Sequence, residues 1–143
     1  LENLVEKEIR SADPGYKGSH LVIVAYNGLV LITGQVPSSE LREKANAVTQ
    51  EFRRVRKVHN ELSVGGPTSM MARTNDAWLT SKVKSRLLAN DEVNGLKIKV
   101  QTENGVVFLL GLIPRAKADK AVEITSQVFG IQKIVKVFEY TDA

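Results

Sequence analysis

The sequence predicts an α+β protein with two tandem domains, each with the element order αββαβ. The main observation is an internal repeat, because VAYNGLVLITGQVP (24–37) and QTENGVVFLLGLIP (101–114) share their Asn-Gly pair, glycine, proline and apolar positions. Apolar residues with helical spacing flank both segments, and Gly-Gly-Pro separates the two copies. We therefore expect domains at 1–65 and 76–143, joined by a linker at 66–75. Each should hold a small three-stranded mixed sheet with two helices on one face.

The first half of each copy is expected to form a helix and a β-hairpin. The helices are expected at 1–12 and 76–89, the strands that follow them at 19–26 and 96–103, and the second strands at 29–36 and 106–113. The Asn-Gly pairs predict tight turns, because both turn positions need a positive φ that these residues tolerate. Either Asn75 or Asp76 can cap the helix of the second copy. Pro37 and Pro114 should end the second strands, since proline donates no ladder hydrogen bond.

The second half of each copy is expected to return the chain to the sheet. The predicted helices are 39–53 and 115–129, the predicted third strands are 56–64 and 131–141, and Ser38 or Ser39 can cap the first of these helices. A strand that follows a helical crossover runs parallel to the strand before it. Gly34 and Gly111 lie inside the second strands, so we expect structural roles for them, either close packing of a helix against the sheet or a bulge.

Composition limits the functional classes. The chain has 143 residues, a net charge of +4 and no cysteine, which excludes disulfides, thiolate metal sites and cysteine nucleophiles. The basic excess lies mostly in the second copy, with +1 over 1–66 and +3 over 67–143. This balance suits an anionic partner. No apolar run is long enough to span a bilayer, no signal peptide is visible, and the start at Leu1 is typical of a mature or trimmed fragment.

Motifs for catalysis, cofactors and nucleic acid are absent from the sequence. His20 and His59 stand without an acidic cluster, and no nucleophile elbow, phosphate loop or dinucleotide fingerprint occurs. The basic run 53–57 follows a helix and is expected to be solvated near its negative end. The loops and paired aromatics of RNA-binding folds are also missing. We therefore expect no enzyme, no cofactor and no nucleic-acid partner.

The first helix of the second copy carries the most informative difference between the copies. At about 100° per residue, Leu79, Val83 and Leu87 form the stripe expected to cover the sheet. The residues on the other sides of the helix are Trp78, Ser81, Lys82, Lys84, Ser85 and Leu88. The first copy shares the stripe, as Leu1, Val5 and Ile9, but has no aromatic residue on its outer face. The fold therefore does not require the only tryptophan of the chain.

Two explanations for Trp78 remain open from the residues alone, beside contact with some other partner. Its side chain could pack on the linker or on the first domain. Alternatively, the helix could lie on a membrane, because Trp favours the bilayer interface and lysines attract anionic headgroups by about 1 kcal/mol each. Such a helix is too short and too weakly apolar to anchor a protein without a second signal.

The NG-V-L-G-VP hairpin, the αββαβ order and the tandem copies resemble BON domains, named for bacterial osmotic-shock and nodulation proteins. ND-W-T-KV-S-LL at the start of the second copy is similar to outer-membrane lipoproteins with two BON domains. The resemblance implies a non-enzymatic periplasmic protein on the inner leaflet of the outer membrane. It also implies binding of anionic phospholipids, such as phosphatidylglycerol and cardiolipin, and support of envelope integrity at division sites.

The resemblance favours membrane contact as the role of Trp78. Proteins of this kind carry a lipidated cysteine after a signal peptide, so lipid anchoring is implied only for a longer precursor of this chain. Two alternatives stay open: an adaptor for outer-membrane assembly or division proteins, and a self-assembling scaffold built from homo-oligomers.

Overall fold

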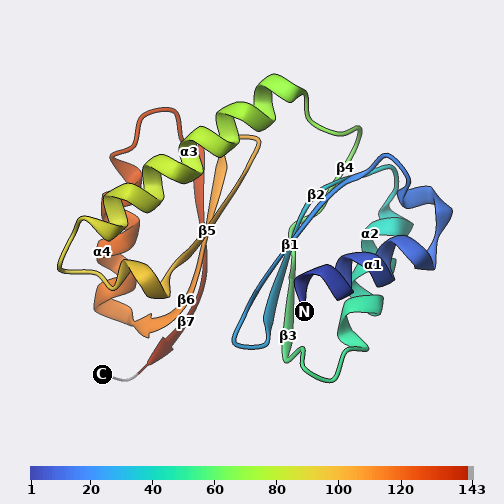
Figure 1. Ribbon diagram of the computed structural model, residues 1–143, viewed down its shortest axis with the longest axis horizontal. Coiled ribbons are helices and arrows are strands. Elements are labelled where there is room, and N and C mark those ends of the chain that lie inside the picture. Colours follow the sequence, from blue (N-terminus) through green and yellow to red (C-terminus); the bar gives the residue numbers. More distant parts are fainter. Residues whose placement is uncertain (142–143) are drawn as a thin grey trace. The chain divides into compact units, whose positions relative to one another are not determined.

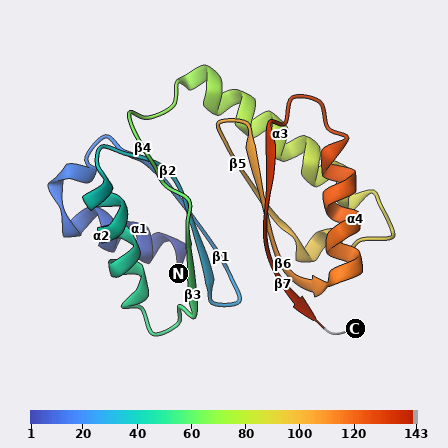
Figure 2. The same ribbon diagram turned by 180° about the vertical axis from the view of Figure 1, so that it is seen from behind.

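The computed structural model describes residues 1–141, which form two compact units. The first unit comprises Leu1–Thr68, and the second begins at Ser69. Asp142 and Ala143, the last two residues of the expected second domain, lie outside the described residues. Both units have the αββαβ order and a small mixed sheet, so the predicted α+β class is confirmed (Figures 1 and 2).

The first unit packs two helices on one face of its sheet (Figure 1). Its elements are α1 (Glu2–Ala12), the 3-10 turn η1 (Pro14–Tyr16), β1 (His20–Tyr26), β2 (Leu29–Val36), α2 (Ser39–Gln50), β3 (Lys57–Asn60) and β4 (Ser63–Val64). β2 is central, with β1 antiparallel on one side and β3 and β4 parallel on the other. Val5 and Ile9 of α1 are fully buried against this sheet. The predicted parallel third strand is therefore confirmed.

The expected third strand of the first unit is divided in two. β3 pairs with the first half of β2 and β4 with its end, and both keep the same register. Between them the amide of Leu62 donates a hydrogen bond to the side-chain oxygen of Asn60 at 3.1 Å. The Leu62 side chain is buried in the core, so the break costs little packing.

The second unit repeats the arrangement with a long, undivided third strand (Figure 2). Its elements are α3 (Met70–Leu88), the 3-10 turn η2 (Gly95–Lys97), β5 (Lys99–Glu103), β6 (Val106–Pro114), α4 (Arg115–Ser126) and β7 (Lys133–Thr141). β6 is central, antiparallel to β5 and parallel to β7, and β7 pairs with β6 along its whole length. The strand expected to begin at residue 96 begins at Lys99, because the turn η2 precedes it. α2 and α4 each end three residues earlier than predicted.

Both hairpins turn on the predicted Asn-Gly pairs. Asn27 and Asn104 each have a φ of 51°, and the glycines that follow have φ values of 80° and 81°. Positive φ at both positions gives a turn whose twist matches that of the flanking strands. The prediction of two tight hairpins is confirmed.

Gly34 and Gly111 lie where the backbones of two segments meet. A Cβ atom on Gly34 would lie 1.8 Å from the carbonyl oxygen of His20, and one on Gly111 would lie 2.5 Å from that of Lys97. The close contact of Gly34 is thus with the first residue of β1, and that of Gly111 is with the turn before β5, whereas the sequence predicts a helix contact or a bulge. Gly34 also has a φ of 127°, which side-chain-bearing residues rarely adopt.

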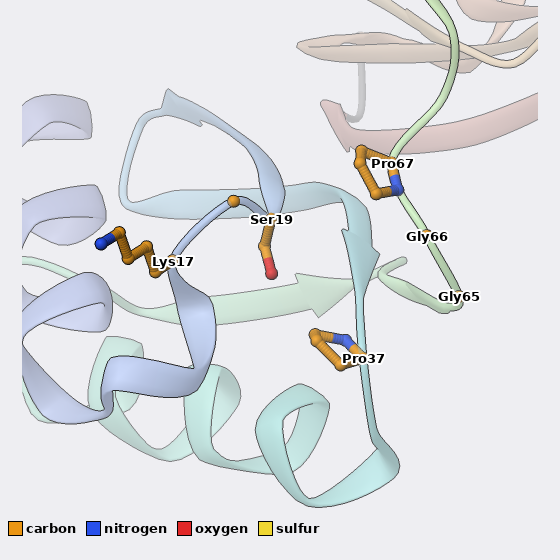
Figure 3. A pocket seen from close by; sticks show the side chains of 7 residues that line it. Lys17, Ser19, Pro37, Gly65, Gly66 and Pro67 are labelled. Carbon is orange, nitrogen blue, oxygen red and sulfur yellow. The ribbon is translucent and has the colours of Figure 1, made fainter.

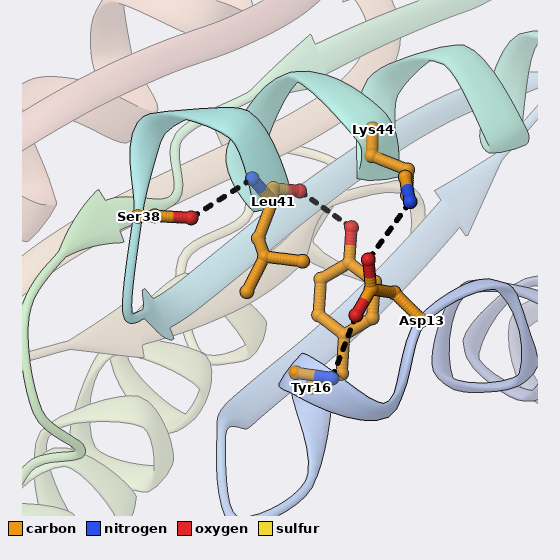
Figure 4. Close-up of polar contacts among 6 residues, drawn as sticks. Asp13, Tyr16, Ser38, Leu41 and Lys44 are labelled. Atoms are coloured by element: carbon orange, nitrogen blue, oxygen red, sulfur yellow. Dashed lines mark hydrogen bonds and ion pairs between the residues drawn. The ribbon is translucent and has the colours of Figure 1, made fainter.

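Tyr16 fastens the loop after α1 to α2 in the first unit (Figure 4). Its buried hydroxyl donates a hydrogen bond to the carbonyl oxygen of Leu41. Beside it, Asp13 accepts from the Lys44 ammonium at 2.8 Å. Ser38 caps α2 by accepting from the Leu41 amide, which confirms one of the two predicted caps. Burial, assisted by the nearby Asp13 carboxylate, raises the pKa of Tyr16 to about 12.

Candidate functional site

The inner face of α3 packs on the sheet as the sequence predicts. Leu79 and Val83 are fully buried and Leu87 is nearly so, in one core with residues of β5, β6 and α4. These three side chains fix the rotation of the helix about its axis. They therefore determine which residues face solvent.

α3 begins at Met70, six residues before the predicted start. Ser69 is the N-cap, and its hydroxyl oxygen accepts from the Ala72 amide at 3.1 Å. Neither Asn75 nor Asp76 caps the helix, so that prediction is wrong. More than half of the linker expected at 66–75 is helical. The reason is that Ser69 caps the helix and the four residues after it, two Met, one Ala and one Arg, all favour helix.

Asp76 has a different role from the one expected. It is buried inside α3, and its carboxylate accepts hydrogen bonds from the amides of Asn104 at 2.8 Å and Gly105 at 2.9 Å. These amides belong to the β5–β6 turn. A charge-assisted contact thus ties the helix to the hairpin of its own unit.

The outer surface of α3 exposes every residue that the sequence singled out there. These residues are Trp78, Ser81, Lys82, Lys84, Ser85 and Leu88. The exposed fraction is 55% for Trp78 and 57% for Leu88, which is large for apolar side chains. The Lys82 ammonium lies 6.0 Å from the centre of the Trp78 ring, at the limit of a cation–π contact.

The extra turns of α3 enlarge this surface. Met70 is 78% exposed and Met71 is 83% exposed. At about 100° per residue, Met70 points in the direction of Leu88, and Met71 points within about 20° of Trp78. A helix rises about 1.5 Å per residue, so the four exposed large apolar side chains of α3 are spread over about 27 Å between Met70 and Leu88. Both methionines lie in the linker that the sequence predicts, so they were not predicted as part of this surface. Ser69, a residue type that favours helix N-caps, is the sequence signal for the earlier start.

Another exposed apolar residue lies in the turn after α4. Phe129 is 93% exposed. Its neighbour Gly130 packs against α3, since a Cβ atom there would lie 3.6 Å from Leu79 Cδ2. The equivalent positions of the first copy are Arg53 and Arg54, so the fold does not require an aromatic residue in this turn. The difference between the two copies at this position is the sequence signal for Phe129.

The charge on the exposed surface of α3 is positive. Lys82, Lys84 and Arg86 are all exposed, and none of them forms an ion pair within residues 1–141. Asp76, the only acidic residue of the helix, is buried against the hairpin turn. The surface therefore combines apolar side chains with cations and lacks exposed carboxylates. We call Met70, Met71, Trp78, Lys82, Lys84 and Leu88, with the intervening Ser81 and Ser85, the α3 face.

Other candidate sites carry less chemistry. A pocket of about 400 Å³ in the first unit is lined by Lys17, Gly18, Ser19, Pro37, Gly65, Gly66 and Pro67 (Figure 3). Figure 3 shows the Lys17 side chain directed away from the others, which leaves mostly glycine and proline. His59 pairs with Glu61 at 2.8 Å, and residues 1–141 hold no group of three potential metal ligands. Among the helices described, none is both long and apolar enough to cross a membrane.

Comparisons with known proteins identify the fold. The sequence matches the BON domain over residues 1–66 and 75–142. It is 39% identical over 142 residues to the outer membrane lipoprotein DolP of Haemophilus influenzae, covering 99% of this chain and 72% of that protein. It is 41% identical over 118 residues to the 21 kDa hemolysin of Actinobacillus pleuropneumoniae, covering 82% of this chain and 61% of that one.

A third relative is the osmotically-inducible protein Y of Escherichia coli, with 30% identity over 121 residues, 82% of this chain and 60% of that one. The chain thus spans 60% to 72% of the length of these three relatives. The family match extends over both αββαβ units and includes both hairpins. The chain belongs to the BON domain family and consists of two BON domains in tandem.

Proposed function

We propose that this chain is a non-enzymatic cell-envelope protein that binds anionic phospholipid surfaces through the α3 face. The observation that carries the proposal is the occurrence, on one helix, of four exposed large apolar side chains together with Lys82 and Lys84, which form no ion pair within residues 1–141. Trp and Met side chains can enter the bilayer interface while lysines meet headgroup phosphates. Phosphatidylglycerol and cardiolipin carry the charge that this surface needs.

The strength of this contact sets its role. Each cation near an anionic bilayer contributes about 1 kcal/mol, and a short interfacial helix adds a modest apolar term. Such a contact orients a protein that is already held at the membrane. Because a relative is an outer membrane lipoprotein, we propose that a lipid anchor supplies the first attachment and that the chain acts at the inner leaflet of the outer membrane. Support of envelope integrity at division sites is the cellular role that we propose.

Liposome co-sedimentation tests the proposal with the Trp78→Glu variant. We expect the unmodified chain to bind vesicles of phosphatidylglycerol and phosphatidylcholine, and to bind vesicles of phosphatidylcholine alone weakly. Trp78→Glu should lose at least tenfold in affinity, since it places a carboxylate at the interface. Its melting temperature should be nearly unchanged, because more than half of the Trp78 side chain is exposed.

The matched control is Val64→Glu in the first domain. Val64 is 52% exposed, close to the value for Trp78, and lies outside the α3 face. This variant should bind vesicles like the unmodified chain. Equal binding to both vesicle types, or full binding by Trp78→Glu, would contradict the proposal. A large loss of stability in Trp78→Glu would indicate a packing role for Trp78 instead.

A further inference from the structure

The first domain has a groove between α1 and the C-terminal end of α2, and none of its residues belongs to the α3 face. It encloses about 270 Å³ and is lined by Leu4, Glu8, Val48, Glu51 and Phe52. Its volume is below the range of about 300–1,000 Å³ that holds a drug-sized ligand. It therefore suits one or two side chains of a partner rather than a whole small molecule.

The lining of the groove combines apolar and acidic side chains. Leu4 is 57% exposed, and Val48 and Phe52 are partly buried at the edge of the core. Glu8 and Glu51 are exposed, and neither forms an ion pair in the part of the chain that the structure describes. The basic run 53–57 starts directly after Phe52, but none of its residues lines the groove.

The second domain provides an internal comparison for this groove. Equivalent residues align the second helices of the two domains. Thr49 and Thr125 are both buried, and the hydroxyl of each donates to the carbonyl oxygen four residues earlier. Glu51 and Gln127 are both the residues that end the second helix of their domain. With this alignment, the residues equivalent to the groove lining are Lys82, Arg86, Ile124, Gln127 and Val128.

The two domains therefore differ in charge at equivalent positions of a shared fold. Where the first domain has Leu4 and Glu8 on its first helix, the second has Lys82 and Arg86. The apolar residues Val48 and Phe52 correspond to Ile124 and Val128, so the apolar part contributed from the second helix and the turn after it is kept. An anionic membrane attracts the second of these surfaces and repels the first.

We propose that the groove of the first domain binds a protein segment that presents an apolar side chain flanked by lysine or arginine. The apolar side chain enters between Leu4 and Phe52, and the flanking cation meets Glu8 or Glu51. Peptides that bind in grooves between helices commonly use this combination of an apolar anchor and charged neighbours. The groove shares no residue with the α3 face, and its existence does not depend on lipid binding.

The test is an NMR titration of the full chain with three designed twelve-residue peptides, without lipid. One peptide has leucine and lysine on an amphipathic helix pattern, the second replaces lysine with glutamate, and the third replaces leucine with serine. We expect saturable shifts around the groove with the leucine–lysine peptide only. The double variant Glu8→Gln/Glu51→Gln should reduce its affinity at least tenfold, and Leu4→Ser should reduce it independently of charge.

The matched control is Glu40→Gln/Glu43→Gln, which removes the same charge from exposed positions of α2 outside the groove. It should bind the peptide like the unmodified chain. Equal binding of the serine–lysine peptide would show plain charge attraction and overturn the proposal. Absence of binding, or shifts elsewhere that the groove variants leave unchanged, would also overturn it. Loss of vesicle binding in Trp78→Glu has no bearing on these outcomes, so the two proposals fail separately.

Discussion

Tyr16 is buried in the first domain and joins the loop after α1 to the α2 backbone through its hydroxyl group. Its neutral form is the one that the fold stabilises, since burial opposes the phenolate. The pKa is about 12 in the folded chain, against 10 as the ordinary value. The contribution of Tyr16 to stability is therefore complete below pH 10 and is lost as pH rises through 12.

Tyr16→Phe should lower the free energy of unfolding by about 1 kcal/mol at neutral pH, the usual net value of one hydrogen bond. The difference between the unmodified chain and the variant should shrink as pH rises above 10. Thermal unfolding followed by circular dichroism at pH 8 and pH 11 measures this difference. Ultraviolet absorbance reports phenolate formation, and the variant should lack one late transition. A difference in stability that stays constant to pH 12 would contradict the assignment.

The two strand glycines give a graded prediction. Gly34→Ala should destabilise the first domain by about 3 kcal/mol, because its Cβ atom meets a backbone oxygen at a positive φ. Gly111→Ala should cost less, about 1–2 kcal/mol, because its clash is milder and its φ is ordinary. Amide spectra recorded during thermal unfolding separate the two domains. The opposite order of the two effects would show that strand backbone contacts are not the cause.

At the scale of elements, the contact between α3 and the β5–β6 hairpin depends on one carboxylate. Asp76→Ala leaves the Asn104 and Gly105 amides without their acceptor, which should cost about 2–3 kcal/mol of second-domain stability. Asp76→Asn keeps one acceptor oxygen and should cost less. Urea unfolding followed by Trp78 fluorescence measures both. Equal stability of Asp76→Ala and the unmodified chain would show that water replaces the carboxylate.

Most of the element order could be predicted because the sequence contains its own comparison. The Asn-Gly turns and the stripe of Leu79, Val83 and Leu87 follow from local rules and appear in the structure. The start of α3 was predicted incorrectly because Asp76 looks like a cap in sequence. Its carboxylate is instead used by a turn 28 residues later, a contact that no local pattern reveals.

The candidate site was only partly predictable for the same reason. Trp78 and its neighbours follow from helical spacing, and all of them are exposed. Whether Met70 and Met71 belong to the exposed surface of the helix depends on where the helix begins. A predicted start at Asp76 leaves both methionines in the linker. Phe129 precedes Gly130, whose tertiary contact with Leu79 of α3 is not visible as a sequence pattern.

At the scale of the whole molecule, duplication has produced two domains of one fold with different surface charge. The cations on and beside the α3 face should make vesicle binding sensitive to salt. The Debye length falls from about 10 Å at 0.1 M salt to about 3 Å at 1 M, so affinity for phosphatidylglycerol vesicles should fall over this range.

Lys82→Gln/Lys84→Gln should weaken vesicle binding at low salt and reduce its salt dependence. Lys7→Gln/Lys17→Gln removes two exposed lysines from the first domain and serves as the control with the same change in net charge. Vesicle flotation at a series of salt concentrations compares the variants. If both pairs respond alike, net charge governs binding and the α3 face does not.

The parallel pairing of β7 with β6 has a consequence for the order of folding. β7 is the last element of its domain in chain order, yet it forms one whole edge of the sheet. The β5–β6 hairpin can form early from local contacts, whereas β7 must wait for residues 133–141 to leave the ribosome or a translocation channel. Until then the edge of β6 is open to pairing with other chains. The order of the elements therefore exposes a long strand edge in the second domain until its last strand has paired.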